Sequence, residues 1–456
     1  MTRKHRWLLF FGIALGSLMS GIDFLAIGVA IDPMSQSLKI DIPTLQWFLT
    51  AFAIGNSSFL VTSGRLADLY GRKMIFIISS FVFMLSSGAI AISSHPFEII
   101  LARLIQGASS GVTTSAALSI LAHIYTPSER TPWIAGLVGT TGFGMVLGPV
   151  VGGFLIHFFS WRMVFLINLP LGAVGLFLAW LYMPRQPVQR GGQKLDFLGV
   201  FLFTSTLVLL TIAISQGQYW GWDSIRTLLT FGAMLIGLVS FLYVEKRSSH
   251  PLIDPIVFKA AHFLAANGVA SCLYFTLTGW ILVMGLYLQR VMGLSPQEAG
   301  VSFAPFGLMV LFLSMRINRL SLWLGTRRLI MLGSTLGMIA FVGMALLPAD
   351  FSYWILVPFF LCYGACFVIV NACTMQSALE FVPLHRAGIA SGKSMMVRWL
   401  WGAIGAAVTS AIFVFQTAQH NDPHEGFVSA MWVFAGCSFL GVLISQFFLR
   451  PKIRAL

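Results

Sequence analysis

Long apolar runs limit the fold of this chain more than any other feature. Residues 7–31, 74–94 and 427–449 each carry at most one charged side chain. Each run is long enough for the ~20-residue helix that crosses a ~30 Å hydrocarbon layer. Because backbone groups in lipid must find hydrogen-bond partners within the segment, we expect these runs to be helices.

The remaining chain continues this pattern. Only 9% of the 456 residues are charged, whereas an ordinary soluble domain has roughly 25%. The sequence predicts an all-α integral membrane protein with about fourteen spans. The predicted spans are 7–31, 45–63, 74–94, 97–121, 133–157, 162–183, 195–215, 226–245, 263–288, 297–317, 328–348, 353–379, 389–415 and 427–449.

The net charge of +13 follows the topology and does not indicate a nucleic-acid partner. With the N-terminus inside, most of the 28 Lys and Arg side chains fall on the inner side, as the positive-inside rule requires. The exceptions are Lys39, Arg162, Arg226 and Arg290 outside, and Arg103, Lys393 and Arg398 within spans. We therefore predict a multi-pass protein of the cell (inner) membrane with both termini cytoplasmic.

The spans divide as six, two and six. We expect an N-terminal six-helix bundle in residues 1–184, a linker with two transmembrane helices in 185–262, and a C-terminal six-helix bundle in 263–456. An internal repeat supports this division: in both Gly64–Lys73 and Asn318–Arg328, an Arg-Leu pair precedes a glycine and then two basic residues. Parallel repeats of this kind form transporters with the substrate site at their interface.

Two opposite charges are predicted at similar depth in the first bundle. Asp23 lies eight residues before the outer end of its span, and Arg103 lies six residues into its own span. Each charge alone in lipid costs ~2.5–3.5 kcal/mol or more, so we expect the two side chains to pair. A conformational change that alters their separation would load or release a proton. The alternative interpretation is a static ion pair that fixes the packing.

The second bundle carries buried cations without an acid at comparable depth. Arg398 lies near the middle of its predicted span, and Lys393 lies closer to the inner end. An unpaired buried Arg is costly, so we expect Arg398 to contact water, a carbonyl or an anion. Substrate contact and a hydrogen-bonded anchor are equally open. Trp47 and Phe52 are the candidate cavity residues in the second span.

A run of small residues marks the fifth predicted span. Small residues four apart allow helices to approach closely, and a proline within the run permits a bend; generic helix packing is the alternative interpretation. The positions are Gly144, Gly148, Pro149, Gly152 and Gly153.

Other patterns indicate little chemistry. The motif His420-x-x-x-His424 could mimic a metal site in a short outer loop, but we expect no metal. The sequence contains no phosphate-binding Gly-x-x-x-x-Gly-Lys-Ser/Thr loop, so ATP coupling is not expected.

These motifs resemble the major facilitator superfamily, and in particular its fourteen-span drug:proton antiporter group. Gly64–Lys73 is similar to the family's loop G-x-L-A-D-x-x-G-R-K, and Gly144–Gly153 is similar to its span-5 antiporter motif. Residues 101–107 are similar to the span-4 motif, and 161–172 to the span 5–6 junction. The first span keeps the acid Asp23 but lacks the Thr and Asn of the group's signature.

The resemblance implies proton-driven export of small organic compounds by alternating access, with the proton gradient as energy source and no cofactor. It implies proton relay at Arg103 and sealing or bending of span 5 at Gly148 and Pro149. It also implies an inner gating loop comprising Gly64, Asp68, Gly71, Arg72 and Lys73.

We therefore predict a secondary transporter, not an enzyme, that exports small hydrophobic or cationic compounds. Its partners would be the small-molecule substrate, protons and the lipid bilayer, and the sequence does not indicate an oligomeric state. The competing hypotheses are a transporter of an anionic metabolite or lipid and a transport-dead membrane receptor or regulator.

Overall fold

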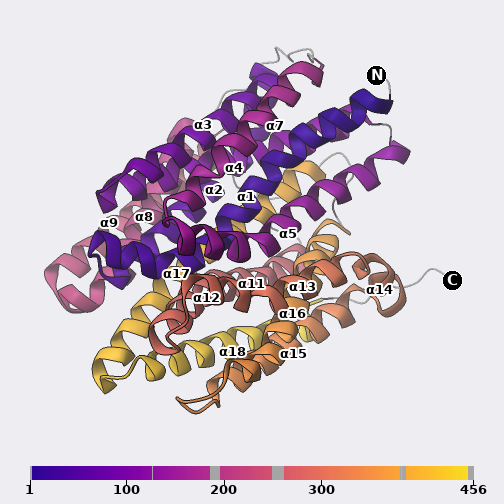
Figure 1. Ribbon diagram of the computed structural model, residues 1–456. Helices are drawn as coiled ribbons and strands as arrows, with labels where there is room; N and C mark the ends of the chain where they lie inside the picture. Colours follow the sequence, from indigo (N-terminus) through magenta and orange to yellow (C-terminus); the bar gives the residue numbers. More distant parts are fainter. Residues whose placement is uncertain are drawn as a thin grey trace.

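The computed structural model describes residues 3–125, 127–184, 196–248, 261–380, 382 and 387–449, and this part of the chain is built from helices without a strand (Figure 1). Most of the two predicted connectors, 184–194 and 246–262, lies outside the described residues.

The helices form two groups with a pair of helices between them in the sequence. The first group contains α1 Arg3–Leu38, α2 Ile42–Tyr70, α3 Arg72–Ile92, α4 Pro96–Ile124, α5 Pro127–Phe158, α6 Met163–Leu166 and α7 Asn168–Tyr182. The pair is α8 Phe197–Trp220 and α9 Ile225–Arg247. The second group contains α11 Ala261–Leu286, the π-helical turn η1 Tyr287–Val291, α12 Pro296–Ser302, α13 Ala304–Ser314, α14 Ile317–Leu324, α15 Thr326–Ala345, the 3₁₀ turn η2 Tyr353–Ile355, α16 Leu356–Glu380, α17 Ala387–His420 and α18 Pro423–Phe447.

The all-α membrane architecture is confirmed. Among the described residues, 12 helical segments are long and apolar enough to cross a membrane. The helices α2 and α4 are not among these twelve, although each has 29 residues. The prediction of fourteen spans therefore stays a prediction.

Several predicted spans differ in detail from the helices. The span predicted at 297–317 is divided into α12 and α13 at Phe303. Pro305 lies in the first turn of α13, where its missing N–H would have no intrahelical partner in any case, so the helix restarts there. The span predicted at 263–288 continues into the π-helical turn η1.

The two groups meet along α1, α2 and α5 of the first group. Within the first group, α1 packs against α5 and α7, and α4 packs against α2 and α3. Across the groups, α2 packs against α17, α5 against α12 and α13, and α1 against α11. The pair α8 and α9 packs together, and α8 also contacts both α2 and α17. Figure 1 shows the first group in indigo to magenta and the second in orange to yellow.

The two repeated loop motifs have matching local structures. Gly71 between α2 and α3 has φ 89° and ψ 131°, and Gly325 between α14 and α15 has φ 82° and ψ 149°. Two residues after each glycine, a basic side chain donates to carbonyl groups at the end of the last helix in its own group. Lys73 Nζ donates to Met183 O after α7 at 2.6 Å, and Arg327 Nε donates to Ser445 O in α18 at 3.3 Å.

We expect any side chain at Gly71 to strain the backbone, since this glycine has a positive φ. The substitution Gly71→Ala should lower stability by about 1–3 kcal/mol, because an L-residue is strained at this positive φ. The measurement is thermal unfolding of the purified protein in detergent. Gly64→Ala is the matched control, since Gly64 lies within α2 and a Cβ atom there would meet no atom within 4 Å. Equal unfolding temperatures for the two variants would contradict this expectation.

Candidate functional site

A buried ion pair joins α1 to α4. Arg103 Nη1 pairs with Asp23 Oδ2, and both side chains have 0% of their surface exposed. Arg103 Nε also donates to Phe48 O of α2 at 2.8 Å. The structure therefore brings together the two charges that the sequence placed at similar depth. Their role in proton coupling stays a prediction.

Three further polar side chains complete the network around Asp23. Gln106 Nε2 donates to Asp23 Oδ1 at 3.1 Å and to Ser87 Oγ at 2.8 Å. Asn168 Nδ2 donates to the same carboxylate oxygen at 3.3 Å and to Ser87 Oγ at 3.2 Å. Because a buried charge is costly unless it is hydrogen-bonded and paired, these contacts offset part of the desolvation penalty of Asp23.

None of these three residues was assigned to the site from the sequence, although Gln106 and Asn168 lie within the motifs at 101–107 and 161–172. Gln106 lies three positions after Arg103, on the same face of α4, and its Oε1 accepts from Arg103 Nη1 at 2.7 Å. Asn168 is a fully buried amide at the start of α7. Ser87 resembles many other serines in apolar helices, so the sequence offers no signal for it.

An aromatic face covers the remaining side of the guanidinium group. Arg103 Nη2 is buried without a hydrogen-bond partner among the described residues. The Cζ atom of Arg103 lies 4.5 Å from the centroid of the Phe52 ring and 5.9 Å from that of Phe165. A cation over a ring face is stabilised by the ring quadrupole. The candidate cavity residue Phe52 is therefore a direct neighbour of the ion pair.

The glycines of α5 allow α1 to pack closely against α5 beside Asp23. A Cβ atom at Gly144 would lie 2.5 Å from Leu18 O, and one at Gly148 would lie 2.6 Å from Ile22 O. At Gly152 it would lie 3.0 Å from the Cβ atom of Ala26. These three glycines therefore form a surface on which the α1 backbone around Asp23 rests directly.

The adjacent face of α5 contacts the second group. A Cβ atom at Gly153 would lie 2.6 Å from Pro296 O of α12, and one at Gly300 would lie 2.2 Å from Pro149 O. The helix α5 continues without interruption through Pro149. One helix thus packs tightly on α1 with one face and on α12 with the next.

Farther along α1, a second ion pair crosses between the groups. Arg290 Nε of the turn η1 pairs with Asp32 Oδ1, and Arg290 Nη2 donates to Ser35 Oγ at 2.8 Å. Gln289 Nε2 donates to Val29 O at 3.1 Å. The helix α1 therefore carries two acids with different partners. Asp23 pairs within the first group, and Asp32 pairs with the second group.

Arg398 of α17 lies in a hydrogen-bonded pocket of α16. Its Nη1 donates to Asn371 Oδ1 at 2.5 Å and to Asn371 O at 3.1 Å, and its Nη2 donates to Thr374 Oγ1 at 3.0 Å. The side chain has 0% exposure, and Nε has no hydrogen-bond partner among the described residues. This geometry matches the carbonyl contact that the sequence suggested. Lys393 is also buried.

Four aromatic rings lie where α1 and α2 meet α11 and α17. The Trp399 ring lies 4.9 Å from Phe24, 5.8 Å from Phe52 and 5.7 Å from Tyr274, measured between centroids. The rings come from both helix groups. Trp47, the other cavity candidate, lies on a different face of α2 and packs against an apolar cluster shared with α8, α9 and α17.

The predicted gating loop is described only in part. Gly64 lies in α2, Gly71 forms the turn, Arg72 begins α3, and Lys73 donates to carbonyl groups at the end of α7. The side chain of Asp68 lies outside the described residues. A gating role for this loop stays a prediction.

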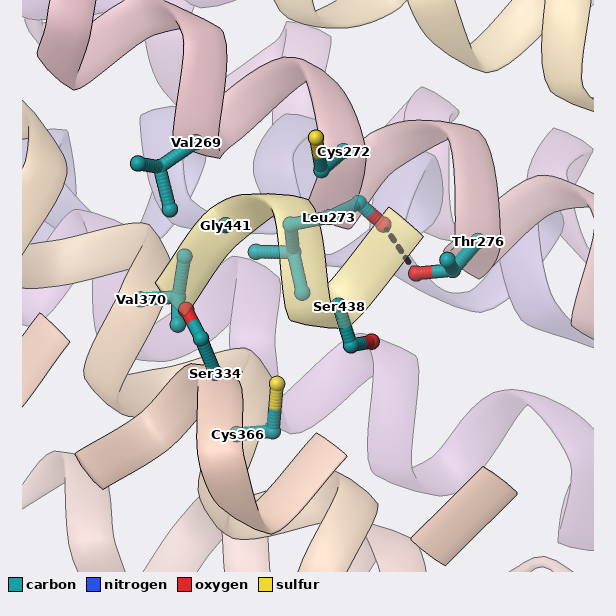
Figure 2. Close-up of a pocket in the computed structure, with 9 residues that line it drawn as sticks. All are labelled: Val269, Cys272, Leu273, Thr276, Ser334, Cys366, Val370, Ser438 and Gly441. Carbon is teal, nitrogen blue, oxygen red and sulfur yellow. Dashed lines mark hydrogen bonds between the residues drawn. The ribbon is translucent and has the colours of Figure 1, made fainter. Parts of the chain in front are cut away.

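Two other features of the described chain leave little room for a ligand. The ring nitrogens of His424 contact Tyr287 Oη at 2.9 Å and Leu347 O at 3.2 Å, so the interpretation of His420 and His424 as metal ligands is not supported. A cavity of about 10 Å³ lies between α11, α15, α16 and α18, lined by Cys272, Ser334, Cys366 and neighbouring residues (Figure 2). Its volume matches about one water molecule.

These features define a class of protein: a multi-pass membrane protein whose two helix groups enclose buried charges. The sequence profile of the Major Facilitator Superfamily matches residues 13–406. The chain belongs to this family and is a transporter of small molecules, not an enzyme.

Similar proteins include both resistance proteins and a vitamin transporter. The chain is 30% identical to the lincomycin resistance protein of Streptomyces lincolnensis, over 99% of this chain and 93% of that protein. It is 27% identical to the multidrug resistance protein Stp of Mycobacterium tuberculosis, over 90% and 76%. It is also 25% identical to the riboflavin transporter RibZ of Clostridioides difficile, over 99% and 100%.

A solved structure supports the fold. The xylose transporter XylE from E. coli, in a partially occluded inward-open conformation, superposes with a TM-score of 0.68 at 16% identity, covering 98% of this chain and 99% of XylE. At this identity the likeness concerns the fold alone.

The close approach of α5 to α1 gives a test of the packing around Asp23. Gly148→Ala should lower stability by about 1–3 kcal/mol, because the added methyl group must push the α1 backbone away. The measurement is thermal unfolding in detergent. Gly142→Ala is the matched control on the same helix, since a Cβ atom there meets nothing within 4 Å. A Gly148→Ala protein as stable as this control would contradict the predicted overpacking.

Proposed function

We propose that this transporter is a proton-coupled exporter of small hydrophobic or cationic organic compounds. The observation that carries the proposal is the Asp23–Arg103 pair, a fully buried acid and base within a hydrogen-bonded network. Ionisable groups inside a membrane are costly and commonly mark proton pathways. The proton gradient supplies the energy, and no cofactor is required.

We further propose a fourteen-span arrangement of two six-helix bundles, residues 1–184 and 263–456, with a two-helix linker in 185–262. The matching turns at Gly71 and Gly325 and the matching contacts of Lys73 and Arg327 support this repeat. We also place the protein in the cell (inner) membrane with both termini in the cytoplasm, in agreement with the charge distribution.

In the proposed mechanism α1 couples the proton to the conformation. A proton on Asp23 removes the negative charge that pairs with Arg103. The electrostatic attraction between α1 and α4 then weakens. The same helix contacts the second group at Asp32 through Arg290. A shift of α1 against the α5 glycines therefore changes both contacts. The loop Gly64–Lys73 would gate the inner side, as in the family it resembles.

The functions of these relatives agree with export without fixing the substrate. Two of the three relatives reported above are resistance proteins, which supports drug export. The riboflavin transporter shows that a similar chain carries a different compound.

The role of Asp23 can be tested in everted vesicles that hold a pH gradient. A compound identified by a growth-sensitivity screen of deletion and overexpressing strains should dissipate the gradient for the wild-type protein. Asp23→Asn should abolish this effect, because the amide cannot take up a proton. Asp223→Asn, which removes an exposed acid in the turn between α8 and α9, should retain it. Full proton movement in the Asp23→Asn protein would disprove the assignment.

A second candidate is a transporter of an anionic metabolite or lipid. The observation that favours it is Arg398, whose described contacts are an amide, a carbonyl and a hydroxyl group without an acid. An uncompensated buried cation attracts an anion.

Arg398→Ala separates the two candidates. If the substrate is anionic, this variant should lose at least about tenfold in anion transport, since a charge-assisted hydrogen bond contributes roughly 1.5–3 kcal/mol. Transport of cations should not change. Arg226→Ala, at the exposed start of α9, is the control. Cation export that persists without any anion transport would exclude the second candidate.

A further inference from the structure

We propose that Trp399 occupies, in this conformation, the position that a planar aromatic substrate takes during transport. The substrate would replace the indole ring against Phe24 and Phe52. This inference rests on the proposed export function, and it adds a substrate class and a residue that selects it.

Trp399 lies between the two helix groups. Its indole ring extends from α17 of the second group to Phe24 of α1 at an interplanar angle of 86° and to Phe52 of α2 at 68°. Both phenylalanines are almost fully buried, at 2% and 1% exposure. Edge-to-face contacts of this kind favour a flat aromatic group. A substrate ring in place of the indole would meet the same two faces.

Trp399 itself is half-buried. The rings that it contacts are enclosed, whereas the indole remains partly accessible. A partly accessible ring that covers two buried rings can leave its position at lower cost than either of them, because less of its surface must return to water.

A series of contacts joins the two buried arginines through this ring. Arg103 lies over Phe52 at 4.5 Å, and Phe52 contacts Trp399. Trp399 contacts Tyr274, whose ring lies 5.9 Å from the guanidinium group of Arg398. Trp399 is the middle member of this series and connects a ring of the first helix group to a ring of the second.

The arrangement connects substrate binding to the ion pair in two contacts. When a substrate displaces the indole, the packing on one side of Phe52 changes. Phe52 also lies against Arg103, which has one nitrogen without a hydrogen-bond partner among the described residues. Substrate occupancy thereby alters the environment of the cation that pairs with Asp23.

The experiment compares two monovalent cations of different shape. Ethidium is planar and aromatic, and tetrapropylammonium is aliphatic. Isothermal titration calorimetry of the purified wild-type protein and of Trp399→Ala gives the ratio of the two affinities. If the indole competes with planar substrates, its removal should raise this ratio about tenfold, because the ligand no longer displaces a ring packed edge-to-face against Phe24 and Phe52. Trp399→Phe keeps a smaller ring and should raise the ratio less.

The control is Trp401→Ala, which removes a Trp two residues along α17 that is 40% exposed. Its affinity ratio should equal that of the wild-type protein. Phe52→Leu, which removes a ring that the substrate would contact, should lower the ratio. If Trp399→Ala fails to fold, the Trp399→Phe protein still gives the comparison.

The outcomes separate this inference from the proposed function. An unchanged or lowered ratio in both Trp399 variants, with wild-type export of ethidium intact, would overturn the inference alone. A wild-type protein that neither binds nor exports either probe would overturn the inference together with the proposed export of cations.

Discussion

The cost of burying charge governs the arrangement of this transporter. Asp23 and Arg103 have no exposed surface, and a charge removed from water must be compensated at once by an opposite charge and by hydrogen bonds. The hydrogen-bond partners come from α2, α4 and the start of α7, through Phe48 O, Gln106 and Asn168, and Ser87 of α3 accepts from both amides. The first helix group is therefore organised around a polar centre, although its outer surface is apolar.

Close helix contact makes this centre possible. Side chains at Gly144 and Gly148 would hold α1 away from α5, and α2 and α4 meet through Gly55 and Gly107 in the same way, since a Cβ atom at Gly107 would lie 2.0 Å from Phe52 O. Backbone contact between helices is a common packing mode in membranes, where small residues increase van der Waals contact. The polar network and the glycine surfaces are thus two parts of one arrangement.

The sequence predicts those features that follow from the free-energy cost of burying a charge or from residue spacing. It does not predict those that depend on how side chains pack in three dimensions. Asp23 and Arg103 are recognisable because a charge in an apolar run demands a partner. Gly144 and Gly148 are recognisable by their spacing. Trp399 could not be identified in this way, because nothing in the sequence distinguishes it from the exposed Trp401 two positions later. The break at Phe303 depends on the tertiary packing of α12 and α13 as well as on Pro305, so hydropathy alone predicts one continuous span.

The position of the helix pair α8–α9 has a consequence for compounds dissolved in the bilayer. The two helix groups share a seam at α2 and α17 and another at α5, α12 and α13. The helix α8 contacts both helices of the first seam. The helix α9 has an almost entirely exposed apolar surface, with only 11% of its membrane-spanning segment buried in the protein. The two flanks of the transporter therefore differ as seen from the lipid: a hydrophobic compound that diffuses laterally meets an added pair of helices on one flank and the seam of α5 with α12 and α13 on the other.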